Sequence, residues 1–330
     1  MKKLLLACMT ALLATGLLMG SAMAKTTWNA NIAWPPKNHH SQAMIEFADQ
    51  VKNATNGELE IIVNLGGALG YKGPELLKAV RDGLLPVSDM VISAVAGDAK
   101  IFQIVTLPFL CRDLEDAKRL TQIARPYFDK AAAKWNQKIL YIAPWPPTGL
   151  WSKDKILKIE DIKGHKVRTY DKNGALLIKN LDATPYALPF SEVYSSLATG
   201  LIDSVITSTT TAVDGKFWEV LNNFERFNIT IATNMVNVNL RAFNKLDKKT
   251  QEALIAAGKA MEEKIWGKVA ALDKEKEALC NQKGITSVPV SPQILEGLKK
   301  ASMSIHKEWL KSAPADAVKI YEEFTKKSGK

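Results

Sequence analysis

Two stretches decide the fold of this chain: KGHKVRTY at positions 163–170 and PFSEVYSSLATGLID at positions 189–203. The first is typical of a turn that leads into a strand, with Arg168 at the far end of that strand. The second predicts a short amphipathic helix with Ser191 as its N-cap and Gly200 as its stop, followed by a new strand near Asp203. Strands and a helix in this order are typical of an α/β protein.

Helix and strand patterns alternate through the rest of the chain. Strands are expected at 28–33, 59–63, 89–93, 138–143 and 235–243, and helices at 41–53, 74–83 and 113–136, the last with a break at Pro126. The short connections favour an open, largely parallel sheet covered by helices on both faces. Even without its first 24 residues, the chain is long enough for two lobes with separate cores.

A long helix is predicted at 248–282, where proline is absent and apolar residues recur at helical spacing after Asp247, the expected N-cap. Such a helix is about 50 Å long, which exceeds the width of one lobe, so it should span both lobes. Gly258 and Gly267 each cost about 1 kcal/mol relative to alanine, which predicts close packing or a bend at one of them.

The run PWPPTG at 144–149 excludes regular structure, because its prolines fix φ and remove backbone donors. We therefore predict that the chain first crosses between the lobes here. The expected division assigns 25–145 and 236–265 to lobe I, and 146–235 and 266–330 to lobe II. Three crossings between the lobes predict a hinged cleft, the usual place for a small ligand.

Residues 1–24 have the pattern of a secretory signal peptide: two lysines, an apolar run and the ending Ala22-Met23-Ala24. We expect cleavage after Ala24 and a periplasmic location. A lipoprotein-type cleavage at Cys8 is disfavoured, because too few apolar residues precede that cysteine.

The formal net charge of the chain is +10, but its lysines are scattered rather than massed. A solvated surface explains this pattern better than nucleic-acid binding, which export also makes an unexpected function. Cys111 and Cys280 could form a disulfide or remain buried thiols. The histidines are too dispersed to indicate a metal site, so we expect no metal. We also expect no cofactor, and a monomeric protein.

Several spaced motifs together resemble the substrate-binding proteins of tripartite ATP-independent periplasmic (TRAP) transporters, the DctP-like family. They are KGxKxR at 163–168, PFSEVY at 189–194, GxID at 200–203 and FWEV at 217–220, with further similarity at 83–90, at 107–109 and in the helix after Asp247. The resemblance implies a two-lobed periplasmic binding protein fold with a hinged cleft and a long helix spanning both lobes. It also implies that Arg168 pairs with the carboxylate of a ligand, and that the membrane subunits of the transporter are partners.

From the residues alone, Arg168 could also be an ordinary surface arginine or the partner of Asp203 or Glu192. Arginine suits carboxylate binding because its planar fork stays charged and can hold both oxygens. The sequence departs from the common family pattern at two positions, with Thr148 where many members carry a second arginine and Thr207 where many carry an asparagine. A single carboxylate with an apolar body is therefore favoured over a dicarboxylate or a sialic-acid-like ligand.

Aromatic residues cluster near the same segments. Trp34 and Trp145 lie in proline-bearing loops at expected strand ends, the edge where open sheets bind ligands, so they are expected cleft walls. The remaining expected ligand-binding residues are Thr148, Thr207, Tyr170, Phe190, Tyr71 and Ser93, whereas Trp151 and Trp218 are assigned to packing. These walls favour an acid with an aromatic or other bulky apolar group, of the phenyl or indole type.

Two other function classes are open. A secreted serine hydrolase would match Ser-x-x-Lys at 152–155 and 304–307, but the motifs that accompany such a nucleophile are absent from the sequence. A ligand-binding sensor that signals to a membrane receptor is compatible with the sequence. The interpretation favoured here is a non-catalytic binding protein that closes on an organic monocarboxylate and delivers it to a TRAP permease.

Overall fold

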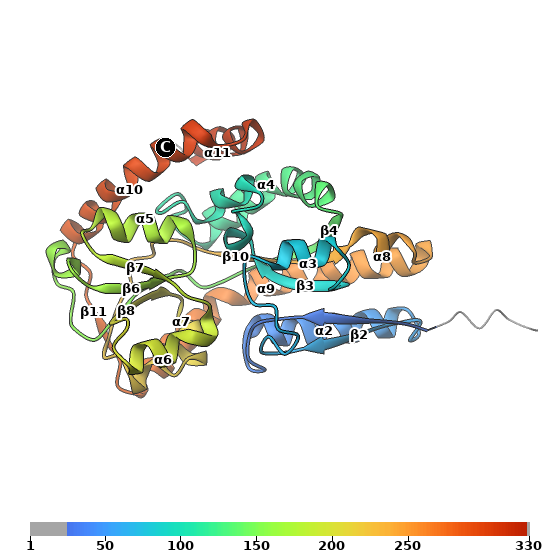
Figure 1. The fold of residues 1–330 in the computed structure, drawn as a ribbon, viewed down its shortest axis with the longest axis horizontal. Helices are drawn as coiled ribbons and strands as arrows, with labels where there is room; N and C mark the ends of the chain where they lie inside the picture. The colour runs from blue at the N-terminus through green and yellow to red at the C-terminus, as the bar shows by residue number, and fades with distance from the viewer. Residues whose placement is uncertain (1–24, 329–330) are drawn as a thin grey trace, which may run out of the picture.

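Residues 25–328 are described by the computed structural model, and the predicted signal peptide at 1–24 lies outside this range. Two lobes lie side by side along the long axis of the molecule, each built on its own sheet (Figure 1). The predicted two-lobed α/β fold is therefore confirmed. Within the described range, no helix combines the length and apolar character needed to span a membrane.

Lobe I is the lobe whose sheet has the strand order β2 (Leu59–Asn64), β1 (Thr26–Asn31), β3 (Val87–Val91), β10 (Thr233–Asn239) and β4 (Gln137–Pro144). Besides the long helix α9 (Lys248–Gln282), the helices that contact these strands are α2 (His39–Ala54), α3 (Leu76–Arg81), α4 (Leu114–Lys134) and α8 (Leu240–Asn244). Two 3₁₀ helices, η2 (Ile92–Val95) and η3 (Lys100–Thr106), follow β3.

Lobe II has the strand order β11 (Thr286–Val288), β9 (Asn223–Glu225), β5 (Gly149–Ser152), β8 (Ser204–Thr207), β6 (Lys166–Thr169) and β7 (Thr184–Ala187). Its helices are α5 (Lys172–Asn180), α6 (Val193–Ala198), α7 (Thr209–Asp214) and α10 (Pro292–Ser312). The 3₁₀ helices η4 (Ile159–Ile162), η5 (Phe190–Glu192) and η6 (Phe217–Glu219) lie in its connections.

The prediction of a largely parallel sheet is confirmed, because in each sheet all strands but one run in the same direction. In lobe I, β10 runs antiparallel to β3 and β4, and in lobe II, β5 runs antiparallel to β8 and β9. Both strands directly follow a crossing from the other lobe, so each enters its sheet from the cleft side. The neighbouring strands β3, β4, β6 and β8 instead end at the cleft, which brings their C-terminal residues together there.

Strand β10 ends earlier than predicted, at Asn239, because this asparagine caps α8 by accepting a hydrogen bond from the backbone N–H of Ala242 (3.0 Å). Apolar and polar residues alternate along much of β10, but every residue of this strand is buried. Its asparagine side chains are hydrogen-bonded inside lobe I instead of facing water, as Asn237 shows by donating to Gln137 Oε1 (2.8 Å).

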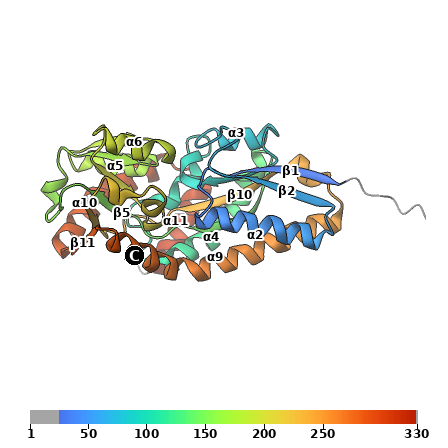
Figure 2. The ribbon, with the colours of Figure 1, turned by 90° about the horizontal axis from the view of Figure 1, so that it is seen from below.

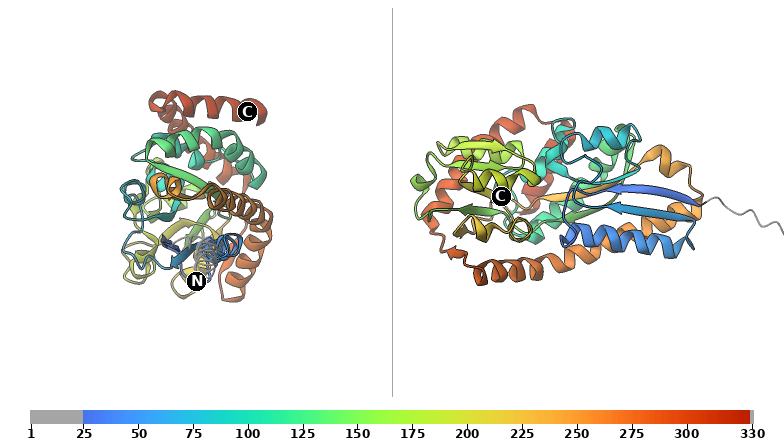
Figure 3. Two further views of the ribbon diagram at one scale, coloured as in Figure 1. Left: turned by 90° about the vertical axis from the view of Figure 1, so that its right-hand side faces the viewer. Right: turned by 60° about the horizontal axis from the view of Figure 1, so that its bottom comes forward.

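The long helix α9 (Lys248–Gln282) confirms the prediction of a single element that spans both lobes. Asp247 caps it by accepting from the N–H of Thr250 (3.0 Å). The helix contacts α2 and β4 of lobe I and α7 of lobe II, and Figures 2 and 3 show it running along both lobes. Its apolar residues are divided accordingly: Met261 lies in a lobe I cluster and Cys280 in a lobe II cluster.

Two local predictions are wrong. Helix α4 continues through Pro126, which lies on its exposed face, so water can solvate the carbonyl that loses its partner while Ala124 and Phe128 keep the other face buried. Ser191 does not cap α6, because the one-turn helix η5 occupies its position and α6 begins only at Val193. Gly200 has the expected left-handed conformation, with φ +74°.

The lobes do not have fully separate cores, contrary to the prediction. One hydrophobic cluster extends from Phe102 and Phe128 in lobe I, through residues of α10 and α11 (Ala315–Ser328), to Ile178 in lobe II. Helix α11 contacts α4 and η3 of lobe I, whereas the boundaries predicted from the sequence place it in lobe II. Those boundaries remain a prediction. Cys111 and Cys280 are buried in different clusters and are not bonded to each other.

Substitution by alanine should have opposite effects on stability at the two glycines of α9, Gly258 and Gly267. A Cβ atom on Gly258 would lie 2.5 Å from the carbonyl oxygen of Leu140, whereas a Cβ on the exposed Gly267 would meet nothing within 4 Å. We therefore expect Gly258→Ala to lower the free energy of unfolding by about 1–3 kcal/mol. Gly267→Ala should raise it by up to about 1 kcal/mol. Urea unfolding of both variants measures this, and equal effects would contradict the close contact at Gly258.

Candidate functional site

A cavity lies between the two lobes, at the edge where β3, β4, β6 and β8 end. It contains about 370 Å³ of space that no atom occupies, which includes space open to solvent. The residues that line it come from both lobes and from the two crossing segments between them. They are Trp34, Val91, Trp145, Thr148, Arg168, Tyr170, Phe190, Thr207, Ser208, Thr211 and Ala232.

Arg168 occupies the centre of this site because β6 pairs with β7 and β8 and ends at the cleft. Its side chain is only 4 % exposed, and Nε donates a hydrogen bond to the carbonyl oxygen of Leu188 (3.0 Å). The guanidinium carbon lies 5.9 Å from the centre of the Tyr170 ring. Burial lowers the pKa of Arg168 to about 10, so the group remains charged at neutral pH.

No ion pair holds this charge within residues 25–328, because no aspartate or glutamate oxygen lies within 4.0 Å of the Arg168 guanidinium. Asp203, one partner considered from the sequence, instead accepts from the backbone N–H of Lys166 (3.0 Å) and from the hydroxyl of Ser204 (3.0 Å). A guanidinium has five N–H donors, of which the bond to Leu188 uses one. The remaining donors are the strongest candidate in the cavity for binding an anion.

Hydroxyl groups form the wall next to Arg168. The hydroxyl of Thr148 lies 3.0 Å from that of Thr230, and the phenol oxygen of Tyr170 lies 2.7 Å from the same Thr230 hydroxyl. The backbone N–H of Thr148 also donates to the carbonyl oxygen of Thr230 (2.8 Å), and the N–H of Ile229 donates to the carbonyl oxygen of Thr148 (2.9 Å). The two crossing segments are therefore joined at this wall, directly beside the cavity.

Aromatic rings form the opposite wall. Trp34 and Trp145 make an edge-on contact, with ring centres 4.6 Å apart and planes at 73°. Trp34 also lies 5.7 Å from the ring of Phe190, which belongs to lobe II. Trp145 is 4 % exposed and contacts the ring of His40 at 4.3 Å. Trp34 and Phe190 thus bring the two lobes into contact across the mouth of the site.

Buried polar groups hold both indole rings. Trp34 Nε1 donates to Asp89 Oδ1 (2.9 Å), and Asn234 Nδ2 donates to the same oxygen (2.7 Å). Asn234 Oδ1 in turn accepts from Trp145 Nε1 (2.7 Å). Burial raises the pKa of Asp89 to about 7 and lowers the pKa of the neighbouring His40 well below its ordinary value. Asp89 Oδ2 lies 3.9 Å from His40 Nδ1.

A second contact joins the lobes outside the cavity. Asn38, which caps α2 in lobe I, donates through Nδ2 to Asp214 Oδ2 at the end of α7 in lobe II (2.6 Å). Burial raises the pKa of Asp214 to about 6, and the hydrogen bond from Asn38 opposes this shift. This bond and the contact between Trp34 and Phe190 both join the two lobes, so the lobes are in a closed arrangement.

The structure brings seven of the nine residues expected from the sequence into this one cavity. The other two lie elsewhere. Tyr71 packs against the large hydrophobic cluster, and its backbone carbonyl accepts from Asn31 Nδ2 (3.3 Å). Ser93 is buried in η2. Burial raises the pKa of Asp171, and the hydroxyls of Thr106 and Ser93 partly offset this rise.

Sequence reasoning missed four lining residues: Val91, Ser208, Thr211 and Ala232. Ser208 had a usable signal, because it directly follows a strand end and caps α7 by accepting from the N–H of Thr211 (3.4 Å). Sequence reasoning also missed Asp89 and Asn234, which do not line the cavity. Both are buried within strands, so neither was considered as a functional residue.

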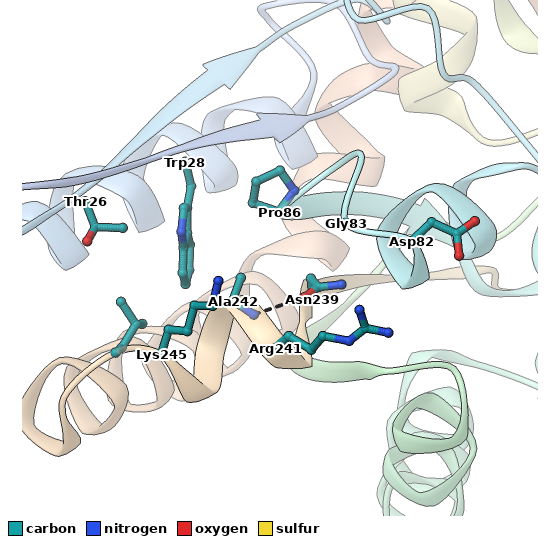
Figure 4. Close-up of a pocket in the computed structure, with 10 residues that line it drawn as sticks. Thr26, Trp28, Asp82, Gly83, Pro86, Asn239, Arg241, Ala242 and Lys245 are labelled. Atoms are coloured by element: carbon teal, nitrogen blue, oxygen red, sulfur yellow. Dashed lines mark hydrogen bonds between the residues drawn. The ribbon is translucent and has the colours of Figure 1, made fainter.

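A larger concavity lies on the outer side of lobe I, between β1 and α8 (Figure 4). The Trp28 side chain points from β1 toward Lys245 and Ala242, and the buried Asn239 is occupied by its capping bond to Ala242. Arg241 and Lys245 are exposed to water. This concavity contains no buried charge that needs a partner, so the cavity at Arg168 is the better ligand site despite its smaller volume.

The raised pKa of Asp89 predicts that Asp89→Asn increases the stability of the fold in a pH-dependent way. Both hydrogen bonds to this carboxyl end on Oδ1, which an asparagine keeps. A carboxyl with a folded pKa of about 7 and an ordinary unfolded value stabilises the fold fully below about pH 4. That contribution is lost as the pH rises to about 7. The stability of Asp89→Asn relative to wild type should therefore grow across this window, measured by urea unfolding at several pH values. A constant difference would contradict the assignment.

Comparison with known proteins agrees with this architecture. The sequence model of the family described as "Bacterial extracellular solute-binding protein, family 7" (DctP) matches residues 30–312. A relative from Escherichia coli (strain K12), the 2,3-diketo-L-gulonate-binding periplasmic protein YiaO, is 24% identical over 279 residues, which cover 83% of this chain and 78% of YiaO.

Two solved structures are similar over nearly their whole length. DctP7, a Bordetella pertussis extracytoplasmic solute receptor binding pyroglutamic acid, has a TM-score of 0.88 and 28% identity, covering 91% of this chain and 99% of DctP7. A marine metagenome TRAP solute-binding protein in complex with co-purified pyroglutamate has a TM-score of 0.88 and 30% identity, covering 92% of this chain and 99% of that protein.

The family match covers most of the chain, and the two lobes, the long helix and the cavity between the lobes are the architecture of such receptors. The chain therefore belongs to family 7 of the bacterial extracellular solute-binding proteins, the periplasmic receptors of TRAP transporters that bind small organic acids.

Proposed function

We propose that this protein binds a compact organic monocarboxylate in the cavity at Arg168 and delivers it to the membrane subunits of a TRAP transporter. The observation that carries this proposal is the buried guanidinium of Arg168, which forms no ion pair in the described part of the chain, although Asp171 acts on its charge. An unpaired buried charge is strongly destabilising. A ligand carboxylate supplies the missing charge and matches the planar fork of an arginine.

The cavity provides for one carboxylate and not for two. Arg168 is the one basic residue among those that line it, and the positions where many relatives carry a second arginine and an asparagine are Thr148 and Thr207. A second carboxylate would have no cationic partner in the cavity, so moving it out of water would cost several kcal/mol. We therefore disfavour dicarboxylates as ligands.

The remaining walls favour a flat, compact body. Trp34, Trp145 and Phe190 offer ring faces and edges, while hydroxyls of Thr148 and Thr207 can bond a polar atom on the ring. The two similar receptors above, at 28% and 30% identity, bind pyroglutamate. We therefore propose a cyclic monocarboxylate of the pyroglutamate class as the ligand of this protein.

An aromatic acid of the phenyl or indole type is the second candidate, and the three aromatic rings on one wall support it. The limited space in the cavity favours a single small ring over an indole. The family consists of binding receptors, so we propose no catalytic role. Export through the leader at 1–24, cleavage after Ala24, a monomeric state and transport rather than sensing belong to the same proposal.

Replacing Arg168 should remove ligand binding without unfolding the protein. We expect Arg168→Ala to weaken the binding of pyroglutamate by roughly 30-fold to several thousand-fold, because the ligand carboxylate loses its buried partner. Arg168→Lys should also bind poorly, because an ammonium lacks the two-pronged geometry. Isothermal titration calorimetry measures both.

Arg241→Ala is the matched control, because Arg241 is a basic residue in the outer concavity of lobe I. It should bind pyroglutamate as the wild type does. If Arg241→Ala lost affinity and Arg168→Ala kept it, the ligand would belong to the outer concavity and the proposed site would be wrong.

A thermal-shift panel tests the ligand class. Pyroglutamate and small aromatic monocarboxylates should raise Tm. Succinate should not, because the cavity lacks a second cation, and galacturonate should not, because the limited space favours a smaller body than a sugar acid. A ligand at 100 times its Kd adds about 2.7 kcal/mol of stability. A clear shift with galacturonate or succinate, and none with any ring-bearing monocarboxylate, would overturn the proposed ligand class.

A further inference from the structure

One continuous chain of hydrogen bonds joins four segments of lobe I beside the cavity. It runs from Trp34, in the loop after β1, to Asp89 in β3, then to Asn234 in β10 and finally to Trp145 after β4. All three bonds are between 2.7 and 2.9 Å long. Asp89 and Asn234 are 2 % and 0 % exposed, so water does not compete for these bonds.

This chain fixes the orientation of both indoles. An indole has a single N–H donor, and in each ring that donor is held by a buried acceptor. Trp34 and Trp145 therefore keep their perpendicular contact at 73°. Packing alone would allow the Trp34 ring to turn about its side-chain bonds, since this residue is only half-buried and faces the cavity.

Neither Asp89 nor Asn234 lines the cavity, so they affect a ligand only through the two tryptophans. The two polar residues are also joined to each other, because Asn234 donates to the oxygen that accepts from Trp34. A change at Asn234 therefore affects both Trp34 and Trp145, whereas a change at Asp89 acts mainly on Trp34.

We infer that Asp89 and Asn234 are positioning residues that set the preference of this receptor for ring-bearing acids, by holding Trp34 and Trp145 as a rigid two-sided aromatic wall. This inference rests on the proposed function for its ligand class. Arg168 supplies affinity for the carboxylate, which every monocarboxylate has. The wall distinguishes a flat ring from an open chain.

The first test measures selectivity. Binding of pyroglutamate and of isovalerate, an acyclic monocarboxylate, is compared by calorimetry in the wild type and four variants. In Asn234→Leu and Asp89→Leu, the preference for pyroglutamate should fall roughly two- to tenfold, the size of an aromatic stacking contribution. Asp89→Asn keeps the acceptor oxygen and should retain the preference.

Asn237→Leu is the matched control. Asn237 lies on the same strand, is 0 % exposed and makes one side-chain hydrogen bond, to Gln137, but it has no bond to either indole. It should lower stability as Asn234→Leu does while leaving the preference unchanged. An unchanged preference in folded Asn234→Leu and Asp89→Leu, or an equal loss in Asn237→Leu, would overturn the inference.

The second test needs no ligand. Two indoles in contact couple their electronic transitions and give a pair of far-ultraviolet circular dichroism bands, which Trp34→Phe removes and thereby identifies. The pair should weaken in Asn234→Leu and Asp89→Leu and persist in Asn237→Leu and Asp89→Asn. Its persistence in Asn234→Leu and Asp89→Leu would show that the chain does not hold the rings. If the wild type binds neither acid, the proposed ligand class fails, and this second test still decides the positioning role.

Discussion

The buried charge of Arg168 is the constraint on which the site depends. Strand β6 carries this guanidinium to the point where both lobes meet, and no carboxylate of the described residues forms an ion pair with it, although Asp171 acts on its charge. The anion proposed to bind here would interact better with the closed form, which surrounds it from both lobes, than with the open one. Ligand binding and lobe closure would then be coupled through this charge.

The elements that cross between the lobes determine how closure can occur. The two short crossings are joined at Thr148 and Thr230, beside the cavity, while α9 runs along both lobes and packs against Leu140 at Gly258. The lobe-to-lobe contacts include the rings of Trp34 and Phe190, the bond from Asn38 to Asp214, and the hydrogen bonds of Asn173 in α5 to Gln103 and Thr106 in η3. Such an arrangement suits a hinge, with continuous elements at the back and weak contacts at the mouth.

The sequence predicted the fold and most of the cavity because its signals were local. A helix without proline and an arginine at a strand end are visible in short windows, and the spaced motifs placed Arg168 in a known family. The features that the sequence did not predict depended on tertiary contacts. The direction of β10 follows from a crossing, and the role of Asn234 follows from partners in three other segments. Pro126 is accepted inside α4 because it faces water, which no local pattern reveals.

A crystal structure of the protein with its bound ligand tests the central claim most directly. The account predicts a carboxylate whose two oxygens lie about 2.7–2.9 Å from nitrogens of the Arg168 guanidinium, with the ring of the ligand against Trp34 and Trp145. A ligand carboxylate bound elsewhere, with Arg168 paired to an acidic side chain of the protein, would contradict it.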